Sequence, residues 1–260
     1  MGIKAYVDNL GALFGEGFPD KDYTLSRVVT VSRMMNHFFA TGVPFLLKND
    51  FKSIYTVFSG GDDLFLIGAW NQILKFADRL NEKFHQFVCK NPGITISCGI
   101  AIAKSGTPVD HLAEMAEEAL RKSKSGGRNR VTVFNQTLTW DEYRELLRIK
   151  DELGDWYRDD VLSRSFLNRL NRFVEMAKRE SELLDKLSIP LEAMDLALWR
   201  SQLGYQLARN ASRKGDDGAS KHQSGDELKA LNARLVDYVG SYRGKFVIPL
   251  WALLYETRGR

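Results

Sequence analysis

The sequence predicts an α+β domain with a ferredoxin-like order of elements, followed by an all-α bundle. In the first half of the chain, runs of β-forming residues alternate with helical patterns. After about residue 135, every segment except one polar loop has helical spacing. We therefore expect an α+β domain over residues 1–135, with its helices on one face of the sheet, and a helical bundle over residues 136–260.

The elements of the first half follow one another as strand, helix, hairpin, helix, strand, helix and strand. The hairpin turn is Ser59-Gly60-Gly61-Asp62-Asp63, where glycine supplies the positive φ that a tight turn needs. Asn91-Pro92-Gly93 ends the second helix, and Thr107-Pro108-Val109-Asp110 has the pattern of a helix start. The strands are expected at 3–8, 53–58, 64–69, 94–102 and 131–134, and the helices at 25–39, 70–89 and 108–124.

Composition limits the class of protein. The chain has 260 residues, of which 44% are hydrophobic and 27% charged, so it is long enough for two domains. The start of the chain has no apolar region typical of a signal peptide, and we expect a cytoplasmic protein that does not enter a membrane. Cys89 and Cys98 lack a C-x-x-C partner, which argues against a disulfide framework or a zinc site. The formal charge of +4 does not by itself predict nucleic-acid binding.

The hairpin turn carries the chemistry that the sequence suggests. If strand 3–8 pairs with the hairpin, Asp8 ends near the turn and can converge with Asp62 and Asp63. Close carboxylates repel one another unless a cation lies between them, and oxygen ligands suit Mg²⁺ or Mn²⁺. Two such ions would support phosphoryl transfer. The alternative is an ordinary solvated turn, since Gly and Asp are the residues that turns favour.

A second, basic segment precedes the last strand of this domain. Residues 119–130, ALRKSKSGGRNR, place cations at a helix end, then a Gly-Gly break, then further arginines. Lys124 and Arg128 could contact a triphosphate, with lysine as a point charge and arginine as a fork. The alternative is a helix C-terminus whose cations complement its dipole.

Several motifs together resemble one family. They are Gly-Gly-Asp-Asp between strands, Ser-Cys-Gly-Ile-Ala at 97–101, and Ala-Leu-x₃-Lys-x₂-Gly-Arg-Asn-Arg at 119–130. Their order and spacing are similar to those of GGDEF diguanylate cyclases and polymerase-like palm domains. Two features more narrowly resemble the large subunit of type III CRISPR effector complexes of the Csm (III-A) type. They are Val-Asp-Asn-Leu-Gly at 7–11, and a turn that reads Gly-Gly-Asp-Asp rather than Gly-Gly-Asp/Glu-Glu-Phe.

The resemblance implies an activity and partners. In that family the second palm domain converts ATP into cyclic oligoadenylates when the assembled complex, guided by CRISPR RNA, binds its target RNA. The partners would be the small helical subunit, the repeat-handle-binding subunit and, through the complex, both RNAs. Carried over to this chain, the implied residues are Asp62 and Asp63 for catalysis, Asp8, Asp62 and Asp63 for Mg²⁺ or Mn²⁺, and Gly60, Gly61, Lys124 and Arg128 for ATP.

One position departs from the family pattern. The cyclases have Asp-x-Asp on the first strand, whereas this chain has Tyr6-Val7-Asp8. This difference leaves open a catalytically weakened or inactive scaffold subunit of the same complex, and a stand-alone cyclic-dinucleotide cyclase is a third possibility. No His-Asp pair of an HD nuclease and no four-cysteine site is visible, so we expect the C-terminal half of such a subunit.

The second half predicts a bundle whose aromatic residues form its core. Residues 212–225 are polar and glycine-rich and are expected to be a loop. Arg200, Arg209, Arg213 and Lys214 could contact RNA or a neighbouring subunit, or could simply face solvent. The apolar positions of the helices are Trp140, Tyr143, Leu147, Leu153 and Trp156, then Phe166, Leu170, Phe173 and Ala177, then Leu196, Trp199 and Leu203 after Ile189-Pro190, with further helices at 226–242 and 246–257.

Overall fold

The computed structural model describes residues 1–17, 19, 23–184, 196, 198–215 and 225–257. These residues form two compact units, Met1–Arg144 and Glu145–Arg260. The predicted fold class is confirmed, because a mixed sheet with helices is followed by a helical part. No helix among the described residues is both long and apolar enough to cross a membrane.

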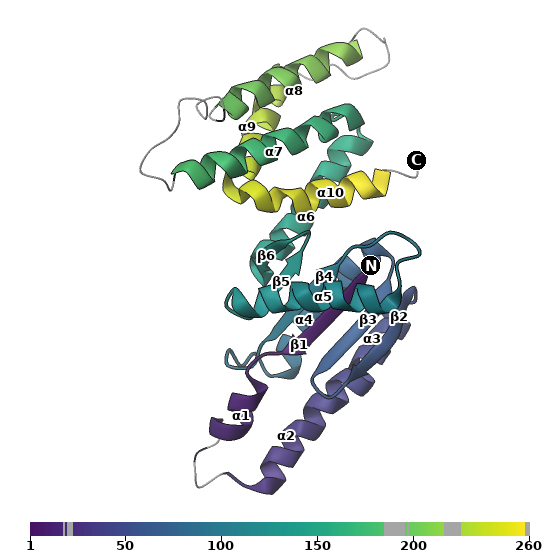
Figure 1. Ribbon diagram of the computed structural model, residues 1–260. Coiled ribbons are helices and arrows are strands. Elements are labelled where there is room, and N and C mark those ends of the chain that lie inside the picture. The colour runs from purple at the N-terminus through teal and green to yellow at the C-terminus, as the bar shows by residue number, and fades with distance from the viewer. Residues whose placement is uncertain (18, 20–22, 185–195, 197, 216–224, 258–260) are drawn as a thin grey trace. The chain divides into compact units, whose positions relative to one another are not determined.

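The first unit is built on a six-stranded sheet with the order β2-β3-β1-β4-β5-β6 (Figure 1). Strand β1 pairs antiparallel with both β3 and β4, and only the β4–β5 pair is parallel. The first four strands in this order reproduce the ferredoxin-like arrangement. The strands are β1 Gly2–Val7, β2 Ile54–Gly60, β3 Asp63–Gly68, β4 Ile96–Ala101, β5 Arg130–Val133 and β6 Gln136–Thr139.

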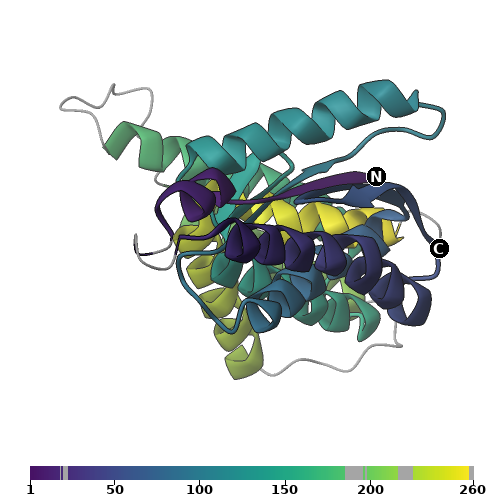
Figure 2. The same ribbon diagram turned by 90° about the horizontal axis from the view of Figure 1, so that it is seen from below.

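Helices cover both faces of the sheet, which corrects the expectation of one covered face. Helix α5 (Val109–Ser125) lies on one face, and α4 (Trp70–Phe87) lies on the other (Figure 2). The face that carries α4 is strongly apolar, and there Ile3, Ala5 and Val7 of β1 are fully buried. The pattern of each helix predicts which of its sides is buried, but it does not say which face of a sheet that side will cover.

The α4 face has an aromatic core. Phe38 meets Phe84 and Phe87 at ring-centroid distances of 5.3 and 5.0 Å, and Phe51 meets Phe76 at 5.5 Å. Phe38 belongs to a π-helical turn, η2 (Phe38–Gly42), between α2 (Leu25–His37) and α3 (Val43–Asp50). The segment α2-η2-α3 therefore packs against α4. The sequence predicts a helix only over 25–39 of this segment, and it does not predict α1 (Leu10–Glu16).

Helix α5 lies unusually close to β4. A Cβ atom at Gly99 would lie 2.1 Å from the backbone nitrogen of Leu120 and 2.4 Å from the carbonyl oxygen of Ala116. Only glycine permits this approach. In the last turn of α5, the buried Ser123 hydroxyl donates to the Cys98 carbonyl at 2.7 Å and lies 2.7 Å from the Thr132 hydroxyl. The C-terminal end of α5 is therefore fixed to the sheet.

The sheet extends further than the sequence predicted. Residues after 135 were expected to be entirely helical outside one loop, but Gln136–Thr139 form β6, paired antiparallel with β5. Strand β6 runs directly into α6 (Trp140–Arg158). The Trp140 indole donates to the Ile96 carbonyl at 3.1 Å, and the Tyr143 hydroxyl donates to the Leu74 carbonyl at 3.0 Å. The first turn of α6 is thus part of the first unit.

The second unit is helical, as predicted. Its helices pack around buried aromatic and aliphatic side chains that include Phe166, Trp199 and Phe246. Helix α8 extends to Gly215, so the predicted loop from residue 212 is helical at its start, and its remainder at 216–224 lies outside the described residues, as does Ile189-Pro190. Besides the end of α6, the elements are α7 Arg164–Leu184, α8 Trp199–Gly215, α9 Gly225–Tyr242, η4 Arg243–Phe246 and α10 Val247–Glu256.

Candidate functional site

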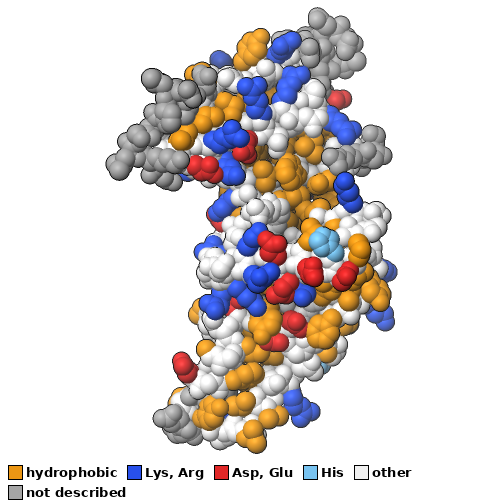
Figure 3. Space-filling view, in the orientation of Figure 1, with side chains coloured by type: hydrophobic (Ala, Val, Ile, Leu, Met, Phe, Trp, Pro, Cys, Tyr) orange, Lys and Arg blue, Asp and Glu red, His pale blue; other side chains and the backbone are white. Residues whose placement is uncertain are grey.

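The topology of the first unit brings three chain segments to one end of the sheet. Strand β1 ends beside the β2–β3 turn, because the Val7 backbone nitrogen donates to the Asp62 carbonyl at 3.0 Å. Helix α5 runs back along β4, so its C-terminal end returns to the same place. Figure 3 shows basic side chains gathered near this end of α5 and acidic ones along the helix. A site for an anionic ligand and a cation can therefore form here.

The Gly-Gly-Asp-Asp turn is tight and held from outside. Gly60 pairs with Asp63 across the hairpin, so the turn itself consists of Gly61 and Asp62. Gly61 has φ of 65°, a conformation that favours glycine. Its backbone nitrogen donates to the side-chain oxygen of Asn36, on α2, at 2.9 Å. Asn36 therefore fixes the position of the turn, a contact that no pattern in the sequence indicated.

The two turn carboxylates lie side by side and are both partly buried. Burial raises the pKa of the Asp63 carboxyl, and the negative charge of Asp62 raises it further. The ammonium groups of Lys4 and Lys124 act in the opposite direction on the same carboxyl. The two carboxylates therefore repel each other, and a cation between them would relieve that repulsion.

Tyr6 lies between the turn and helix α5. It stands opposite Asp63 in the β1–β3 register, and its hydroxyl lies near the Asp62 carboxylate. The interaction with Asp62, together with burial and the charge of Asp63, raises the pKa of Tyr6 to about 12. The Lys124 ammonium sits over the Tyr6 ring, 3.5 Å from its centroid. Tyr6 therefore connects the acidic turn to the basic end of α5.

Asp8 has a different environment from the one predicted. Its side chain is only 2% exposed. The Thr95 hydroxyl donates to its Oδ2 at 2.8 Å, the Ser97 hydroxyl donates to Oδ1 at 2.8 Å, and the Asn129 backbone nitrogen donates to Oδ2 at 3.0 Å. Asp8 is thus the anchor of the loop that follows α5. The sequence placed it near the turn but gave no sign of these partners.

The basic loop after α5 is strained, and Asp8 holds it. Gly127, Arg128 and Asn129 all have positive φ, at 121°, 59° and 48°. Left-handed conformations at residues other than glycine cost free energy and persist only where neighbouring contacts impose them. Arg128 is exposed at the end of this loop. The two residues predicted to contact phosphate thus lie on different elements, Lys124 on the last turn of α5 and Arg128 on the loop that follows it.

The predicted three-acid cluster does not form. Among the described residues, no group of three or more His, Cys, Asp or Glu side chains is arranged to hold a metal ion. Asp62 and Asp63 are adjacent, whereas Asp8 is engaged with hydroxyl and amide donors. Lys4 and Glu117 also lie near the turn and form an ion pair of 3.0 Å. Lys4 lowers the pKa of Asp63, and Glu117 raises it.

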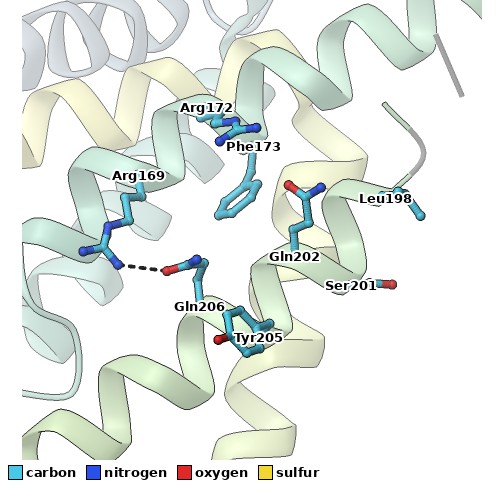
Figure 4. Close-up of a pocket in the computed structure, with 8 residues that line it drawn as sticks. All are labelled: Arg169, Arg172, Phe173, Leu198, Ser201, Gln202, Tyr205 and Gln206. Atoms are coloured by element: carbon cyan, nitrogen blue, oxygen red, sulfur yellow. Dashed lines mark hydrogen bonds between the residues drawn. The ribbon is translucent and has the colours of Figure 1, made fainter. Parts of the chain in front are cut away.

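The second unit has a groove of its own between α7 and α8 (Figure 4). Its volume is about 540 Å³, and its walls include the buried Phe173, the exposed Tyr205 and the exposed Leu198. Arg169 donates to Gln206 at 2.8 Å across it, and Arg172 is exposed on α7. Such a groove, apolar inside and basic at its rim, is suited to a partner that carries both apolar and acidic groups.

The other arginines predicted as partner contacts differ in their surroundings. Arg200 donates to Glu180 at 2.8 Å and stacks on Trp199 at 4.4 Å, so it has a structural role within the bundle. Arg209 is exposed on α8. The side chains of Arg213 and Lys214 lie outside the described part of the chain.

The strand order, with an acidic hairpin turn beside a basic helix end, is that of a palm domain. Residues 2–132 match the family described as Cas10/Cmr2, second palm domain. The chain belongs to this family.

Known relatives agree with this assignment. A protein of Methanocaldococcus jannaschii, described as the CRISPR system single-strand-specific deoxyribonuclease Cas10/Csm1 of subtype III-A, is 34% identical over 197 residues, which cover 65% of this chain and 24% of the relative. A protein of the same description from Streptococcus thermophilus is 26% identical over 98% of this chain and 32% of its own length. The chain thus spans about a quarter to a third of these curated relatives.

Solved structures share the fold. A Csm1–Csm4 cassette in complex with pppApApA has a TM-score of 0.66 and 22% sequence identity, covering 97% of this chain and 36% of that one. Csm1 of T. onnurineus has a TM-score of 0.64 and 24% identity, covering 97% of this chain and 37% of that one. The likeness extends over both units of this chain, so the bundle as well as the palm domain has a structural counterpart.

Proposed function

We propose that the chain is the nucleotidyltransferase part of a type III CRISPR effector subunit and that it makes cyclic oligoadenylates from ATP at the Gly-Gly-Asp-Asp turn. The observation that carries this proposal is the adjacent, partly buried pair Asp62 and Asp63, which faces the cationic end of α5 across Tyr6. Family membership supports it as well. Csm1–Csm4 structures that share this fold contain ATP, pppApA and cA4.

The role of each residue in this proposal follows from its charge. Asp62 and Asp63 would hold Mg²⁺ or Mn²⁺, since carboxylate oxygens are the ligands these ions prefer. When bound there, such an ion would supply Lewis-acid chemistry, lowering the pKa of a nucleotide hydroxyl and neutralising charge on the phosphates. Lys124 and Arg128 would bind the triphosphate, and Gly60 and Gly61 would let the phosphates approach the backbone. Asp8 would keep the loop of Arg128 in position through its bond to Asn129.

The scaffold alternative is also supported by a specific observation. Tyr6 stands where the cyclases have a first-strand acid, and its hydroxyl lies beside the Asp62 carboxylate. If this contact prevents cation binding, the chain contributes only to assembly. The stand-alone cyclase alternative would predict use of GTP rather than ATP.

We further propose that the chain functions within a type III complex in the cytoplasm, with the helical bundle contacting a partner subunit. The groove between α7 and α8 is a candidate contact for an acidic amphipathic helix, because its apolar floor and the exposed Arg172 match the two sides of such a helix. The small helical subunit of the complex is the partner that the resemblance suggests. The CRISPR RNA and the target RNA would be reached through the complex.

Reconstitution tests the proposal directly. The chain is incubated with ATP and Mn²⁺ or Mg²⁺, alone and with the other subunits, CRISPR RNA and matching target RNA, beside an Asp62→Ala/Asp63→Ala variant. We expect cyclic adenylates that disappear in the variant. A complex that still binds its target RNA but forms no product would favour the scaffold, and product from GTP alone would favour the cyclase.

A further inference from the structure

We propose that the Gly-Gly-Asp-Asp turn of this chain binds one divalent cation rather than two. Tyr6 stands in the place of the acid that would hold a second cation, and the Lys124 ammonium takes the place of that cation. This inference rests on the proposed function, because it concerns the same site. It differs from the two-ion expectation that the sequence raised, and it follows from the donor atoms that the structure brings to the turn.

Asp8 has little capacity left for a metal ion. Its Oδ2 already accepts from the Thr95 hydroxyl at 2.8 Å and from the Asn129 backbone nitrogen at 3.0 Å, and the Ser97 hydroxyl lies 2.8 Å from Oδ1 and 2.9 Å from Oδ2. Each carboxylate oxygen offers about two lone pairs. Ligation by Asp8 would also have to displace donors that are themselves buried or fixed, which leaves unsatisfied polar groups. The acidic donors of the site therefore reduce to Asp62 and Asp63.

Tyr6 does not replace the missing acid as a ligand. A neutral phenol brings no charge to balance a cation, so Tyr6 does not substitute for a carboxylate ligand. Its ring, moreover, carries the Lys124 ammonium at 3.5 Å from the centroid. A second divalent ion on this side of Asp62 would lie close to that positive charge, and like charges at such distances repel.

The charges of the turn balance with a single ion. Asp62 and Asp63 supply two negative charges, which one divalent cation neutralises. The Tyr6 hydroxyl would remain beside Asp62 as an outer partner, since ligating carboxylates are commonly hydrogen-bonded themselves.

Counting bound Mn²⁺ tests this inference without any need for catalysis. The full chain is titrated with Mn²⁺ in the absence of nucleotide, so that no ion is held by phosphates, and bound ion is measured by electron paramagnetic resonance. We expect one Mn²⁺ per chain at saturation. Tyr6→Asp adds a carboxylate and should raise the count to two, whereas Tyr6→Phe keeps the count at one and serves as the matched control, because it changes the same position without adding charge.

The outcomes separate this inference from the proposed function. Two bound ions in the unaltered chain, or a single ion in a folded Tyr6→Asp variant, would overturn the single-cation inference while leaving the proposed function intact. The unaltered chain decides the question even if Tyr6→Asp does not fold. If the Asp62→Asn/Asp63→Asn variant binds Mn²⁺ as the unaltered chain does, the turn is not the metal site, and the proposed function itself fails.

Discussion

The Oδ2 atom of Asp8 accepts a hydrogen bond of 3.0 Å from the backbone nitrogen of Asn129, at the other end of the palm sequence. This contact joins the end of β1 to the loop after α5. Asn129 and its neighbour Arg128 both have left-handed backbone conformations, so the contact compensates for local strain. The acid that the sequence suggested as a metal ligand is therefore a support for the basic loop.

Replacing Asp8 should affect stability more than metal binding. Asp8→Asn places an amide NH₂ among donors that need an acceptor, and we expect the free energy of unfolding to fall by about 1–3 kcal/mol. Urea denaturation measures the loss, with Asp50→Asn as the control because Asp50 is exposed. A variant with unchanged stability but no Mn²⁺ binding would mean that Asp8 is a ligand after all.

Gly99→Ala should disrupt the packing of α5. The added methyl group would meet the backbone of Leu120 and Ala116 at 2.1 and 2.4 Å, and backbone atoms cannot move aside as a flexible side chain does. Overpacking of this kind typically costs about 1–3 kcal/mol or more. Gly11→Ala is the matched control, because nothing lies within 4 Å of a Cβ atom at that position. Equal melting temperatures for the two variants would contradict the close approach.

The two cysteines should differ in reactivity at every pH at which the chain is folded. Cys98 is buried, and burial raises the pKa of its thiol well above the usual value, with the nearby Asp8 charge acting in the same direction. Cys89 is exposed. Titration with a disulfide reagent should therefore detect one thiol in the native chain and two after denaturation.

The raised pKa of Cys98 also has a consequence for stability. Because the folded state keeps its proton more firmly than the unfolded state, the stability contributed by this thiol is complete below the unfolded pKa and is lost as the pH rises above it. Cys98→Ala should remove this part of the alkaline loss of stability, as followed by thermal denaturation between neutral and alkaline pH. An unchanged alkaline profile would exclude the contribution.

Charge reversal at the rim of the α7–α8 groove should weaken assembly. Arg172 is exposed beside the groove, so Arg172→Glu should lower the affinity for an acidic helical partner about tenfold or more, while the fold is unaffected. Co-purification of the reconstituted complex measures this effect. Arg121→Glu on α5 is a suitable control, because Arg121 is an exposed arginine of the other unit. Equal losses for both variants would point to a general effect of charge.

The local pattern of the sequence predicted much of the palm domain, and the reasons are physical. The hairpin was predictable because two apolar β-runs flank a glycine-containing turn. Helix α4 was predictable because its apolar residues repeat along one side. The face that α5 covers was not predictable, since this depends on how β4 and β5 are ordered in the sheet rather than on the helix itself.

The site was predictable in its residues more than in their roles. Asp62, Asp63 and Lys124 do gather at one end of the sheet, as the order of strands implies. The partners of Asp8 could not be foreseen, because Thr95, Ser97 and Asn129 are ordinary polar residues far away in sequence. The same holds for Asn36, whose amide oxygen binds the turn from a helix.

The continuity of β6 with α6 determines how the chain can be divided for experiments. A fragment that stops at residue 135 would lose the edge strand Gln136–Thr139 and expose the side of β5 that it covers. It would also lose the Trp140 and Tyr143 side chains, which are 4% and 0% exposed, and with them their bonds to Ile96 and Leu74. An isolated palm domain should therefore be expressed with the whole of α6, to residue 158, and truncation at 135 should yield aggregated protein.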